Sequence, residues 1–320
     1  MKALVTGAAG FIGSHLSEAL LRDGHELVAL DSFSDYYPRS LKESNIAGLR
    51  EDARCWFVEA DLTDVALEPL LEGVDVVYHL AAQPGVRASW GRTFETYLRD
   101  NVLATQKLLE AARDSKVQRI IYASSSSIYG DAESYPTPES VTPQPVSPYG
   151  VTKLAAEHLC RLYWRRSGVP VLSLRFFTVY GPRQRPDMAF HVFLRALLSG
   201  TPIDVFGDGE QSREFTYVDD IVRALLLAAE RGAPGAVYNV GGGDEVTLNQ
   251  AIGLLMQVSG REVPLRYGER QPGDARRTAA DPTLARRDLG YEPRVGLEQG
   301  LRAEYGWLEA LLRAPAGRDA

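Results

Sequence analysis

Residues 2–13, KALVTGAAGFIG, join a short apolar run to a glycine-rich turn and then to a stretch with helical spacing. This arrangement is typical of the first strand–turn–helix unit of a dinucleotide-binding domain. Glycine there allows a tight turn and close approach of the backbone to a pyrophosphate, and the N-terminus of the helix attracts phosphate. The alternative interpretation is an ordinary glycine turn. The dinucleotide interpretation predicts cofactor contacts from Gly7, Gly10, Phe11, Ile12 and Gly13.

Further apolar, β-branched runs alternate with helical stretches through the first half of the chain. Strands that are apolar throughout belong to a parallel sheet covered on both faces, so the alternation predicts a doubly wound, Rossmann-type α/β domain. The expected buried strands are Ala3–Thr6, Leu27–Asp31, Trp56–Ala60, Val74–Leu80, Arg119–Ser124 and Val169–Arg175, and the expected helices include Phe11–Arg22, Asn101–Arg113 and Tyr149–Arg166.

The pattern changes after residue 176, where prolines and glycines are scattered among shorter elements. We therefore expect residues 1–176 to form the dinucleotide-binding domain and residues 177–320 to form mainly a smaller, substrate-binding lobe. Because Ala236–Val240 is again typical of a buried strand, the lobe is predicted to be interleaved with the sheet, with return segments near 214–245.

The composition is that of a globular protein, with 45% hydrophobic and 24% charged residues among 320. Net charge is −7, so neither nucleic acid nor an anionic membrane is an expected partner. The sequence has no apolar run of about 18 residues and no signal-peptide pattern, which predicts a cytoplasmic protein. Two distant cysteines and five histidines show no ligand spacing, so we expect no metal site.

Two aspartates follow predicted strands at the edge where a dinucleotide would lie. Asp31 comes 18 residues after Gly13, where a carboxylate accepts hydrogen bonds from ribose hydroxyls and repels a 2′-phosphate. This favours NAD over NADP, although Asp31 could instead cap a loop. Asp61, after the third strand, is predicted to reach the adenine edge, with a turn role as the alternative.

Tyr149 and Lys153 are four residues apart, so they project from the same face of the predicted helix. A tyrosine acts as a base near neutral pH only if a cation and hydrogen bonds favour its phenolate, and a lysine one turn away supplies that cation. The run Ser124–Ser127 follows the fifth predicted strand beside the same cleft. One of its hydroxyls could relay a proton between a substrate alcohol and Tyr149, although four serines can also form a simple polar loop.

Several stretches together resemble the extended short-chain dehydrogenase/reductases of the nucleotide-sugar epimerase/dehydratase family. The similarity runs from Lys2 to about Leu308 and rests on TGAAGFIGSH (6–15), HLAAQPGVR (79–87), SSSSIYG (124–130), PYGVTK (148–153), RFFTVYGPRQRPDMA (175–189) and REFTYVDD (213–220). The resemblance implies NAD as cofactor and a catalytic set in which Tyr149 is the base, Lys153 orients it and Ser125 assists. It also implies NAD contacts from Leu62, Leu80, Ala81, Ala82 and Asn101.

The resemblance further implies a homodimer. Its interface would form from the helices near Asn101–Arg113 and Tyr149–Arg166, which pair with those of a second copy into a four-helix bundle. The sequence itself indicates only that these two helices are amphipathic.

Within the family, the stretches DSFSDYYPRSLK (31–42), RPDMA (185–189) and QPGDARRTAAD (271–281) most resemble UDP-glucuronate 4-epimerases. At the two positions after the catalytic serine, related dehydratases carry an Asp-Glu pair and decarboxylases carry a glutamate, whereas this chain has Ser126 and Ser127. Without a carboxylic acid to protonate a leaving hydroxyl or assist loss of CO2, plain epimerisation is favoured.

The expected substrate contacts divide between the sugar and the UDP. Ser126, Ser127 and Thr178 could donate hydrogen bonds to a sugar carboxylate, with Arg185 as a nearby cation. Alternatively, Thr178 only finishes a strand and Arg185 lies on the surface. The resemblance implies a diphosphate contact from Arg213 and a ribose contact from Asp274. Arg87 and Arg183 are further candidates for an anion, with a surface salt bridge as the alternative for each. Because Gln271 stands where many relatives have arginine, Arg276 or Arg277 could take part instead.

These observations predict an NAD-dependent 4-epimerase that converts UDP-glucuronate to UDP-galacturonate through a transient 4-keto sugar. The alternatives are a UDP-glucose 4-epimerase, a UDP-glucuronate decarboxylase and, more remotely, a non-catalytic NAD-binding regulator.

Overall fold

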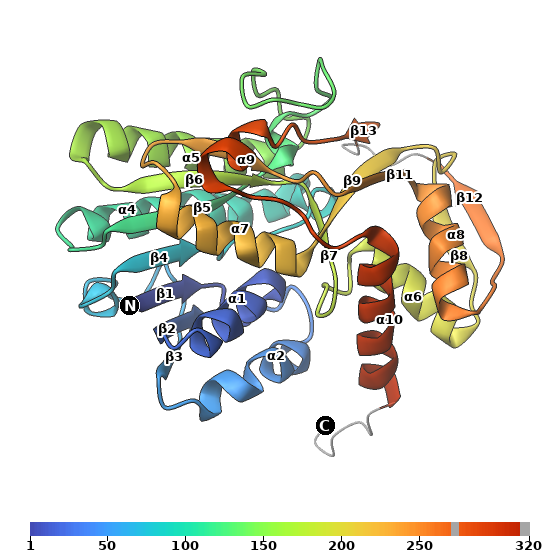
Figure 1. Cartoon of the computed structure of the whole chain (residues 1–320), viewed down its shortest axis with the longest axis horizontal. Helices are drawn as coiled ribbons and strands as arrows, with labels where there is room; N and C mark the ends of the chain where they lie inside the picture. The colour runs from blue at the N-terminus through green and yellow to red at the C-terminus, as the bar shows by residue number, and fades with distance from the viewer. Residues whose placement is uncertain (270–274, 314–320) are drawn as a thin grey trace.

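The computed structural model of the chain describes residues 1–269 and 275–313 (Figure 1). Its main sheet has seven strands, all parallel, in the order β10-β6-β5-β4-β1-β2-β3. The order reverses between β1 and β4, and ligands of such sheets bind at the carboxyl ends of the strands beside this switch point. The strands are β1 (Lys2–Thr6), β2 (Glu26–Asp31), β3 (Cys55–Glu59), β4 (Val76–His79), β5 (Arg119–Ser125), β6 (Val171–Phe176) and β10 (Val237–Val240).

Helices cover both faces of this sheet. The side chains of Ala3 and Val5 share one core with Leu16 of α1, whereas Leu4, pointing the other way, shares a second core with Leu108 of α4. The doubly wound prediction is therefore confirmed. The first face carries α1 (Phe11–Arg22), α2 (Arg39–Glu51) and α7 (Val218–Arg231), and the second carries α4 (Ala104–Arg113) and α5 (Pro148–Ser167).

Two predicted elements differ in detail. The third strand was expected to be buried throughout, but β3 is the edge of the sheet and Trp56 is 52% exposed, because a strand with a single neighbour is only partly covered. The helix expected from Asn101 continues from a short π-helix, η4 (Leu98–Leu103), and becomes α-helical at Ala104. Such π-turns are common near functional sites.

The later part of the chain forms a smaller lobe beside the carboxyl ends of the main sheet (Figure 1). Strand β9 (Ser212–Tyr217) lies at its centre and pairs with β7, β11 and β13, while β8 and β12 form a separate pair. The other elements are β7 (Thr178–Tyr180), α6 (Ala189–Ser199), β8 (Ile203–Phe206), β11 (Asp244–Thr247), α8 (Leu248–Ser259), β12 (Leu265–Gly268), β13 (Arg277–Thr278) and α10 (Leu297–Arg313).

The chain returns from this lobe to the main sheet before leaving it again. After β9, α7 covers one face and β10 adds the outermost parallel strand beside β6. Helix α9 (Thr283–Leu289) then packs against α7 and β10. The interleaved lobe predicted from the strand-like run near Ala236 is therefore present.

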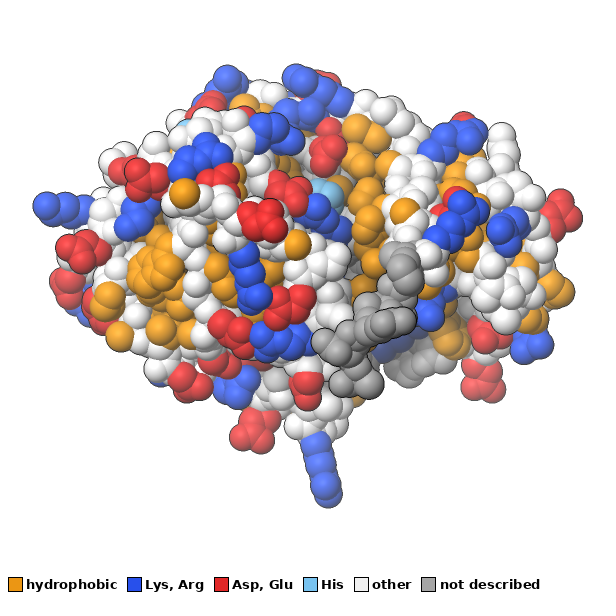
Figure 2. Space-filling view, turned by 90° about the horizontal axis from the view of Figure 1, so that it is seen from below, with side chains coloured by type: hydrophobic (Ala, Val, Ile, Leu, Met, Phe, Trp, Pro, Cys, Tyr) orange, Lys and Arg blue, Asp and Glu red, His pale blue; other side chains and the backbone are white. Residues whose placement is uncertain are grey.

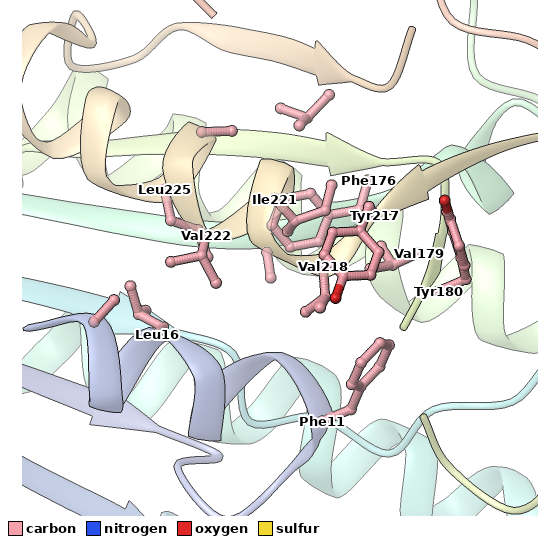
Figure 3. Packing of buried hydrophobic residues seen from close by; sticks show 14 of the residues in the cluster. Phe11, Leu16, Phe176, Val179, Tyr180, Tyr217, Val218, Ile221, Val222 and Leu225 are labelled. Atoms are coloured by element: carbon pink, nitrogen blue, oxygen red, sulfur yellow. The ribbon is translucent and has the colours of Figure 1, made fainter. Parts of the chain in front are cut away.

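The core of the lobe continues into that of the main domain, and Figure 3 shows Tyr180 and Tyr217 of the lobe together with Val218 of α7. The ring of Tyr180 packs edge-on against those of Phe190, Phe215 and Tyr217 at centroid distances of 5.6, 6.2 and 5.6 Å. These side chains belong to the same core as Val218 at the start of α7. Each such ring contributes about 2 to 3 kcal/mol of burial free energy to this shared core.

Short helices complete the described residues: η1 (Pro69–Leu71), η2 (Arg87–Ser89), η3 (Gly91–Thr93), α3 (Phe94–Tyr97) and η5 (Ser126–Ile128). None of the helices in the described part of the chain is long and apolar enough to cross a membrane. Figure 2 shows Lys and Arg side chains interspersed with Asp and Glu on one face, in keeping with the mixed composition.

Candidate active site

The glycine-rich turn lies at the switch point of the sheet, between β1 and α1. Gly7 has φ +74°, and a Cβ there would lie 2.9 Å from the backbone nitrogen of Ala81. A Cβ on Gly13 would lie 2.0 Å from the carbonyl oxygen of Gly7. Both positions therefore require glycine, one for the turn and the other for close packing of the helix. All five residues predicted from this segment line a cavity of about 900 Å³.

Asp31 ends β2 at the edge of this cavity. Its two carboxylate oxygens accept hydrogen bonds from the backbone N–H groups of Ala9 and Phe33, at 3.0 and 2.8 Å. Burial raises the pKa of Asp31, while these hydrogen bonds and the charge of Lys42 lower it. Asp31 thus both caps the local turn and lines the cavity, and each oxygen keeps a further lone pair for a ribose hydroxyl.

The other predicted cofactor residues divide into two groups. Leu62, Leu80, Ala81 and Ala82 line the cavity, and so does Asp61, which also accepts hydrogen bonds from the backbone and hydroxyl of Thr63 at 2.7 Å. Asn101 is buried and absent from the lining. Its amide instead joins Gln83 to Thr152 of α5, with distances of 2.7 Å from the Gln83 N–H and 3.0 Å to the Thr152 hydroxyl. Its predicted direct contact with NAD therefore gains no support from the cavity.

Ser125, Tyr149 and Lys153 meet in the same cavity. Ser125 is the last residue of β5, and its hydroxyl hydrogen-bonds Tyr149. Tyr149 lies in the first turn of α5, where the side chain of Ser147 caps the helix by accepting the N–H of Gly150 at 3.1 Å. Burial raises the pKa of Tyr149, against which the Ser125 hydrogen bond and the charge of Arg185 act.

Lys153 lies one turn further along α5 and is 4% exposed. Its ammonium nitrogen lies 4.7 Å from the centre of the Tyr122 ring. Burial lowers the pKa of Lys153 to about 8, with the charge of Glu157 among the opposing causes. The pKa of Lys153 therefore lies close to neutral pH, where a change in its surroundings alters the fraction of lysine that is protonated.

Four of the predicted sugar contacts line the wall next to Tyr149: Ser126, Ser127, Thr178 and Arg185. The guanidinium of Arg185 donates to the carboxylate of Asp187 from Nε at 3.0 Å and from Nη2 at 3.1 Å. Arg185 is therefore not a surface residue but part of the cavity, as Thr178 is at the start of β7.

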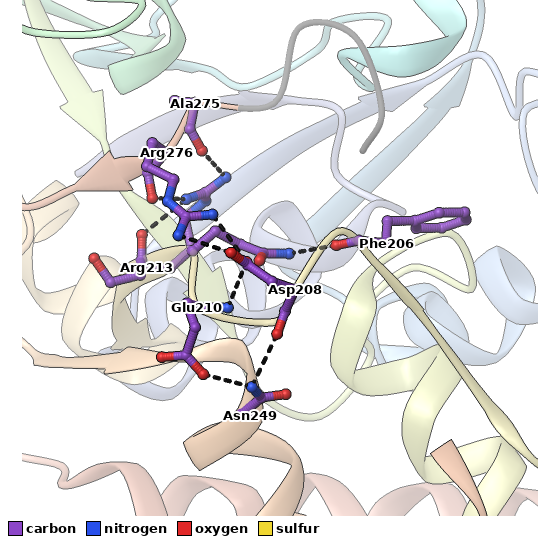
Figure 4. Close-up of polar contacts among 9 residues, drawn as sticks. Phe206, Asp208, Glu210, Arg213, Asn249, Ala275 and Arg276 are labelled. Atoms are coloured by element: carbon purple, nitrogen blue, oxygen red, sulfur yellow. Dashed lines mark hydrogen bonds and ion pairs between the residues drawn. The ribbon is translucent and has the colours of Figure 1, made fainter. Parts of the chain in front are cut away.

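Arg213 lines the cavity from the start of β9, and Figure 4 shows its polar contacts. Its guanidinium donates to the carbonyl oxygens of Ser212 and Ala275, at 2.8 and 2.5 Å. Arg276 and Arg277 are instead paired with Asp208 and Glu245, away from the lining. Arg87 also lines the cavity, and its guanidinium carbon lies 4.6 Å from the centre of the Phe206 ring. Asp274 and Gln271 lie outside the described residues.

A family model described as the NAD dependent epimerase/dehydratase family matches residues 3–241. The chain belongs to this family. A relative from Bacillus subtilis (strain 168), called an uncharacterized UDP-glucose epimerase, YtcB, is 45% identical and covers 97% of this chain and 99% of its own. The UDP-glucuronate 4-epimerase of Thermodesulfobacterium geofontis (strain OPF15) is 37% identical, covering 95% of each chain.

A solved structure of the UDP-glucuronic acid 4-epimerase from Bacillus cereus, in complex with UDP-glucuronic acid and NAD, superposes with a TM-score of 0.95. It is 44% identical to this epimerase/dehydratase and covers 97% of this chain and all of its own. The recognition from sequence motifs and the predicted fold class are therefore confirmed.

Tyr36 and Asp187 are cavity residues of this epimerase/dehydratase that were not predicted from the sequence. Tyr36 donates from its hydroxyl to Asp187 at 3.0 Å, and Asp187 also holds Arg185. Both belong to stretches singled out for their resemblance, 31–42 and 185–189, but nothing in their spacing indicates that they meet. Among the described residues, no group of three or more His, Cys, Asp or Glu side chains could hold a metal ion.

Proposed function

We propose that this protein is an NAD-dependent 4-epimerase of UDP-sugars, with UDP-glucuronate as its preferred substrate and UDP-galacturonate as the product. The observation that carries the proposal is that Ser125, Tyr149 and Lys153 line the same cavity as the glycine-rich turn of residues 7–13. The relatives named above support it, since two of the three are UDP-glucuronate 4-epimerases. Gly7 and Gly13 fit a bound dinucleotide, because a Cβ at either position would collide with the backbone of the turn or its neighbour.

Bound NAD supplies a reversible acceptor for the hydride at C4 of the sugar. Tyr149 takes the proton of the 4-hydroxyl, directly or through Ser125, and returns it after the 4-keto sugar has presented its other face. Lys153, one turn away on α5, favours the phenolate of Tyr149 by its charge. Asp31 would hold the adenosine ribose, and Asp61 and Leu62 would contact the adenine end.

The carboxylate of the sugar would accept hydrogen bonds from Ser126, Ser127 and Thr178 and pair with Arg185. Held in this way, the C–C bond between the carboxylate and the sugar ring is not aligned with the π system of the C4 ketone. This suppresses loss of CO2 from the β-keto acid. Arg213 and Arg87 would contact the diphosphate. The ribose contact of Asp274 stays a prediction.

A UDP-glucose 4-epimerase is the second candidate, and one contact favours it. Asp187 already neutralises Arg185 at the sugar end of the cavity, which weakens the attraction for a second carboxylate. The Bacillus subtilis relative also carries UDP-glucose in its name.

Purified protein incubated with UDP-glucuronate, without added NAD, tests the reaction. We expect NMR of the sugar to detect UDP-galacturonate and no pentose, because the retained NAD is regenerated in every cycle. Tyr149→Phe is expected to lower kcat by at least about 100-fold while bound NAD stays at the parental level. Release of CO2 would identify a decarboxylase, and full turnover by Tyr149→Phe would contradict the assignment of the base.

Arg185→Met tests the substrate. Losing charge-assisted hydrogen bonds to the sugar carboxylate should lower kcat/KM for UDP-glucuronate by roughly 10- to 100-fold, with a change of less than about threefold for UDP-glucose. Arg183→Met is the matched control, because Arg183 pairs with Glu18 and does not line the cavity. Equal losses for the two sugars would contradict the carboxylate role.

We also propose a cytoplasmic homodimer. Four exposed apolar side chains on η4 and α5 support the dimer: Leu98, Leu103, Val151 and Leu162, each 44 to 51% exposed. Val151 and Leu162 are eleven residues apart, about three turns, and so share one face of α5. A monomer would leave this face in water.

A further inference from the structure

Glu157 is a buried carboxylate that the proposed mechanism does not use. It lies on α5, one turn beyond Lys153, and is 5% exposed. It accepts hydrogen bonds from Arg175 on β6 at 2.6 Å (Nη2) and 3.1 Å (Nε), and from the hydroxyl of Ser124 at 2.6 Å. It is absent from the residues lining the large cavity, so it does not border the space for the sugar or the cofactor.

The bond to Ser124 connects Glu157 with the catalytic serine. Ser124 and Ser125 are the last two residues of β5, so fixing one side chain restricts the backbone that carries the other. Ser125 in turn hydrogen-bonds Tyr149 and accepts the N–H of Ser127 at 3.1 Å. Glu157 therefore ties the end of β5 to the helix that bears Tyr149 and Lys153.

The arginine on the other side of Glu157 is itself fixed. Arg175 donates to the hydroxyl of Tyr129 at 2.6 Å, and Tyr129 donates to the side-chain carbonyl of Asn239 on β10 at 2.8 Å. All of these side chains are buried. A buried, fully hydrogen-bonded network of this kind restricts its members to a single arrangement.

Glu157 also contributes to the charge around Lys153. The titratable groups that face the ammonium are Glu157 and Cys160 on its own helix, Tyr122 on β5 and His79 on β4. Burial raises the pKa of Cys160 and lowers that of His79 to about 3, so both are neutral near pH 7. The carboxylate of Glu157 is thus the negative charge in this group that favours protonated Lys153.

We infer that Glu157 is a positioning residue for the epimerisation: through Ser124 it fixes Ser125 against Tyr149, and it supplies a negative charge one helical turn from the ammonium of Lys153. The inference rests on the proposed function, because it assigns Glu157 to that catalytic set. It assigns no contact with substrate or cofactor to Glu157.

Two substitutions separate the two effects. Glu157→Gln keeps the shape and an acceptor for Ser124 but removes the charge. Ser124→Ala removes the hydrogen bond but leaves the pair of Glu157 and Arg175 intact. Glu139→Gln is the matched control, since the Glu139 carboxylate accepts the N–H of Asn239 at 2.7 Å in the same network but touches neither Ser124 nor Lys153.

Steady-state epimerisation of UDP-glucuronate is measured for each purified variant between about pH 6 and pH 10, with bound NAD and thermal unfolding recorded. For Glu157→Gln we expect kcat to fall roughly 10- to 100-fold with KM changed by less than about threefold. The alkaline limb of the pH profile of this variant moves to lower pH, because Lys153 without the charge of Glu157 loses its proton at a lower pH. For Ser124→Ala we expect kcat to fall roughly 10-fold with the pH profile unmoved. Glu139→Gln is expected to lower the unfolding temperature only.

The inference is overturned if Glu157→Gln binds NAD and keeps the parental kcat and pH profile, or if Glu139→Gln shifts the alkaline limb equally. Should Glu157→Gln fail to fold, because Arg175 is left without its partner, Ser124→Ala decides: a parental kcat overturns the inference. The parent and Tyr149→Phe, measured in parallel, separate the two levels. A parent that does not epimerise UDP-glucuronate would remove the proposed function itself, whereas an active parent and an inactive Tyr149→Phe beside fully active Glu157→Gln and Ser124→Ala would remove only the role of Glu157.

Discussion

Gly13 occupies a position where the structure leaves no room for a side chain. A methyl group there would meet the carbonyl oxygen of Gly7 at 2.0 Å, so Gly13→Ala must displace α1 or the turn. We expect loss of bound NAD and a decrease of about 1 to 3 kcal/mol in the free energy of unfolding, measured by absorbance of the purified protein and by urea titration.

Gly48 provides the control. It lies in the exposed part of α2, and a Cβ there would meet nothing within 4 Å. Gly48→Ala is expected to leave NAD in place and to raise the free energy of unfolding by about 0.5 to 1 kcal/mol. Parental NAD content in Gly13→Ala would show that the close approach is not required.

The sequence was most informative for residues whose place depends on local spacing. That Gly7, Asp31 and the Tyr149–Lys153 pair would meet at one cavity could be predicted, because each is defined by its position in one strand–turn–helix unit or on one helix face. The contact of Tyr36 with Asp187 could not, because it joins residues 151 positions apart whose meeting depends on how the lobe sits over the sheet. The cofactor contact of Asn101 stays a prediction, and its hydrogen bond with Thr152 could not be predicted for a similar reason, because Thr152 lies on another helix.

At the scale of elements, His79 holds two strands and a helix together. Its Nδ1 lies 2.8 Å from the Thr6 hydroxyl on β1, and its Nε2 lies 2.9 Å from the Thr105 hydroxyl on α4. The Thr105 hydroxyl donates to the carbonyl of Asn101 at 2.7 Å, so it accepts from Nε2–H, and Nδ1 accepts from Thr6. A neutral imidazole satisfies this arrangement, and burial lowers the pKa of His79 to about 3.

The low pKa of His79 predicts a loss of stability in acid. Between pH 6.5, the ordinary value, and about 3, the unfolded chain binds a proton that the folded chain does not, so the free energy of unfolding falls as pH falls. We expect His79→Asn to reduce the slope of that free energy with pH by up to about 1.4 kcal/mol per pH unit, measured by urea titration between roughly pH 5 and 6.5.

The difference between the slopes of His79→Asn and the parent isolates the contribution of His79 from those of other groups. Burial raises the pKa of Glu214 to about 7, so its contribution has the opposite sign and is lost as pH rises through that value. Identical slopes for His79→Asn and the parent would contradict the assignment.

The element boundaries themselves followed from apolar periodicity, whereas the π-helical start of α4 did not, because only tertiary contacts favour it over the α-helix.

At the scale of the whole molecule, the apolar face of η4 and α5 predicts the assembly. Leu162→Glu should convert the proposed dimer to a monomer, because a carboxylate would lose its water in the interface. Sedimentation velocity measures the mass. Leu312→Glu is the control, since Leu312 is equally exposed but lies on α10. A monomeric parent, or an unchanged mass for Leu162→Glu, would contradict the interface.

The position of β10 has a consequence for how the protein is made. The strand that closes the sheet beside β6, at residues 237–240, is translated only after β7, α6, β8 and β9 of the lobe and after α7. Until then β6 has an open edge of unpaired backbone groups, which other chains can join. A ribosome must therefore synthesise about three quarters of this polypeptide before the nucleotide half can be completed, and no single cut in the gene divides the protein into two independently folding halves.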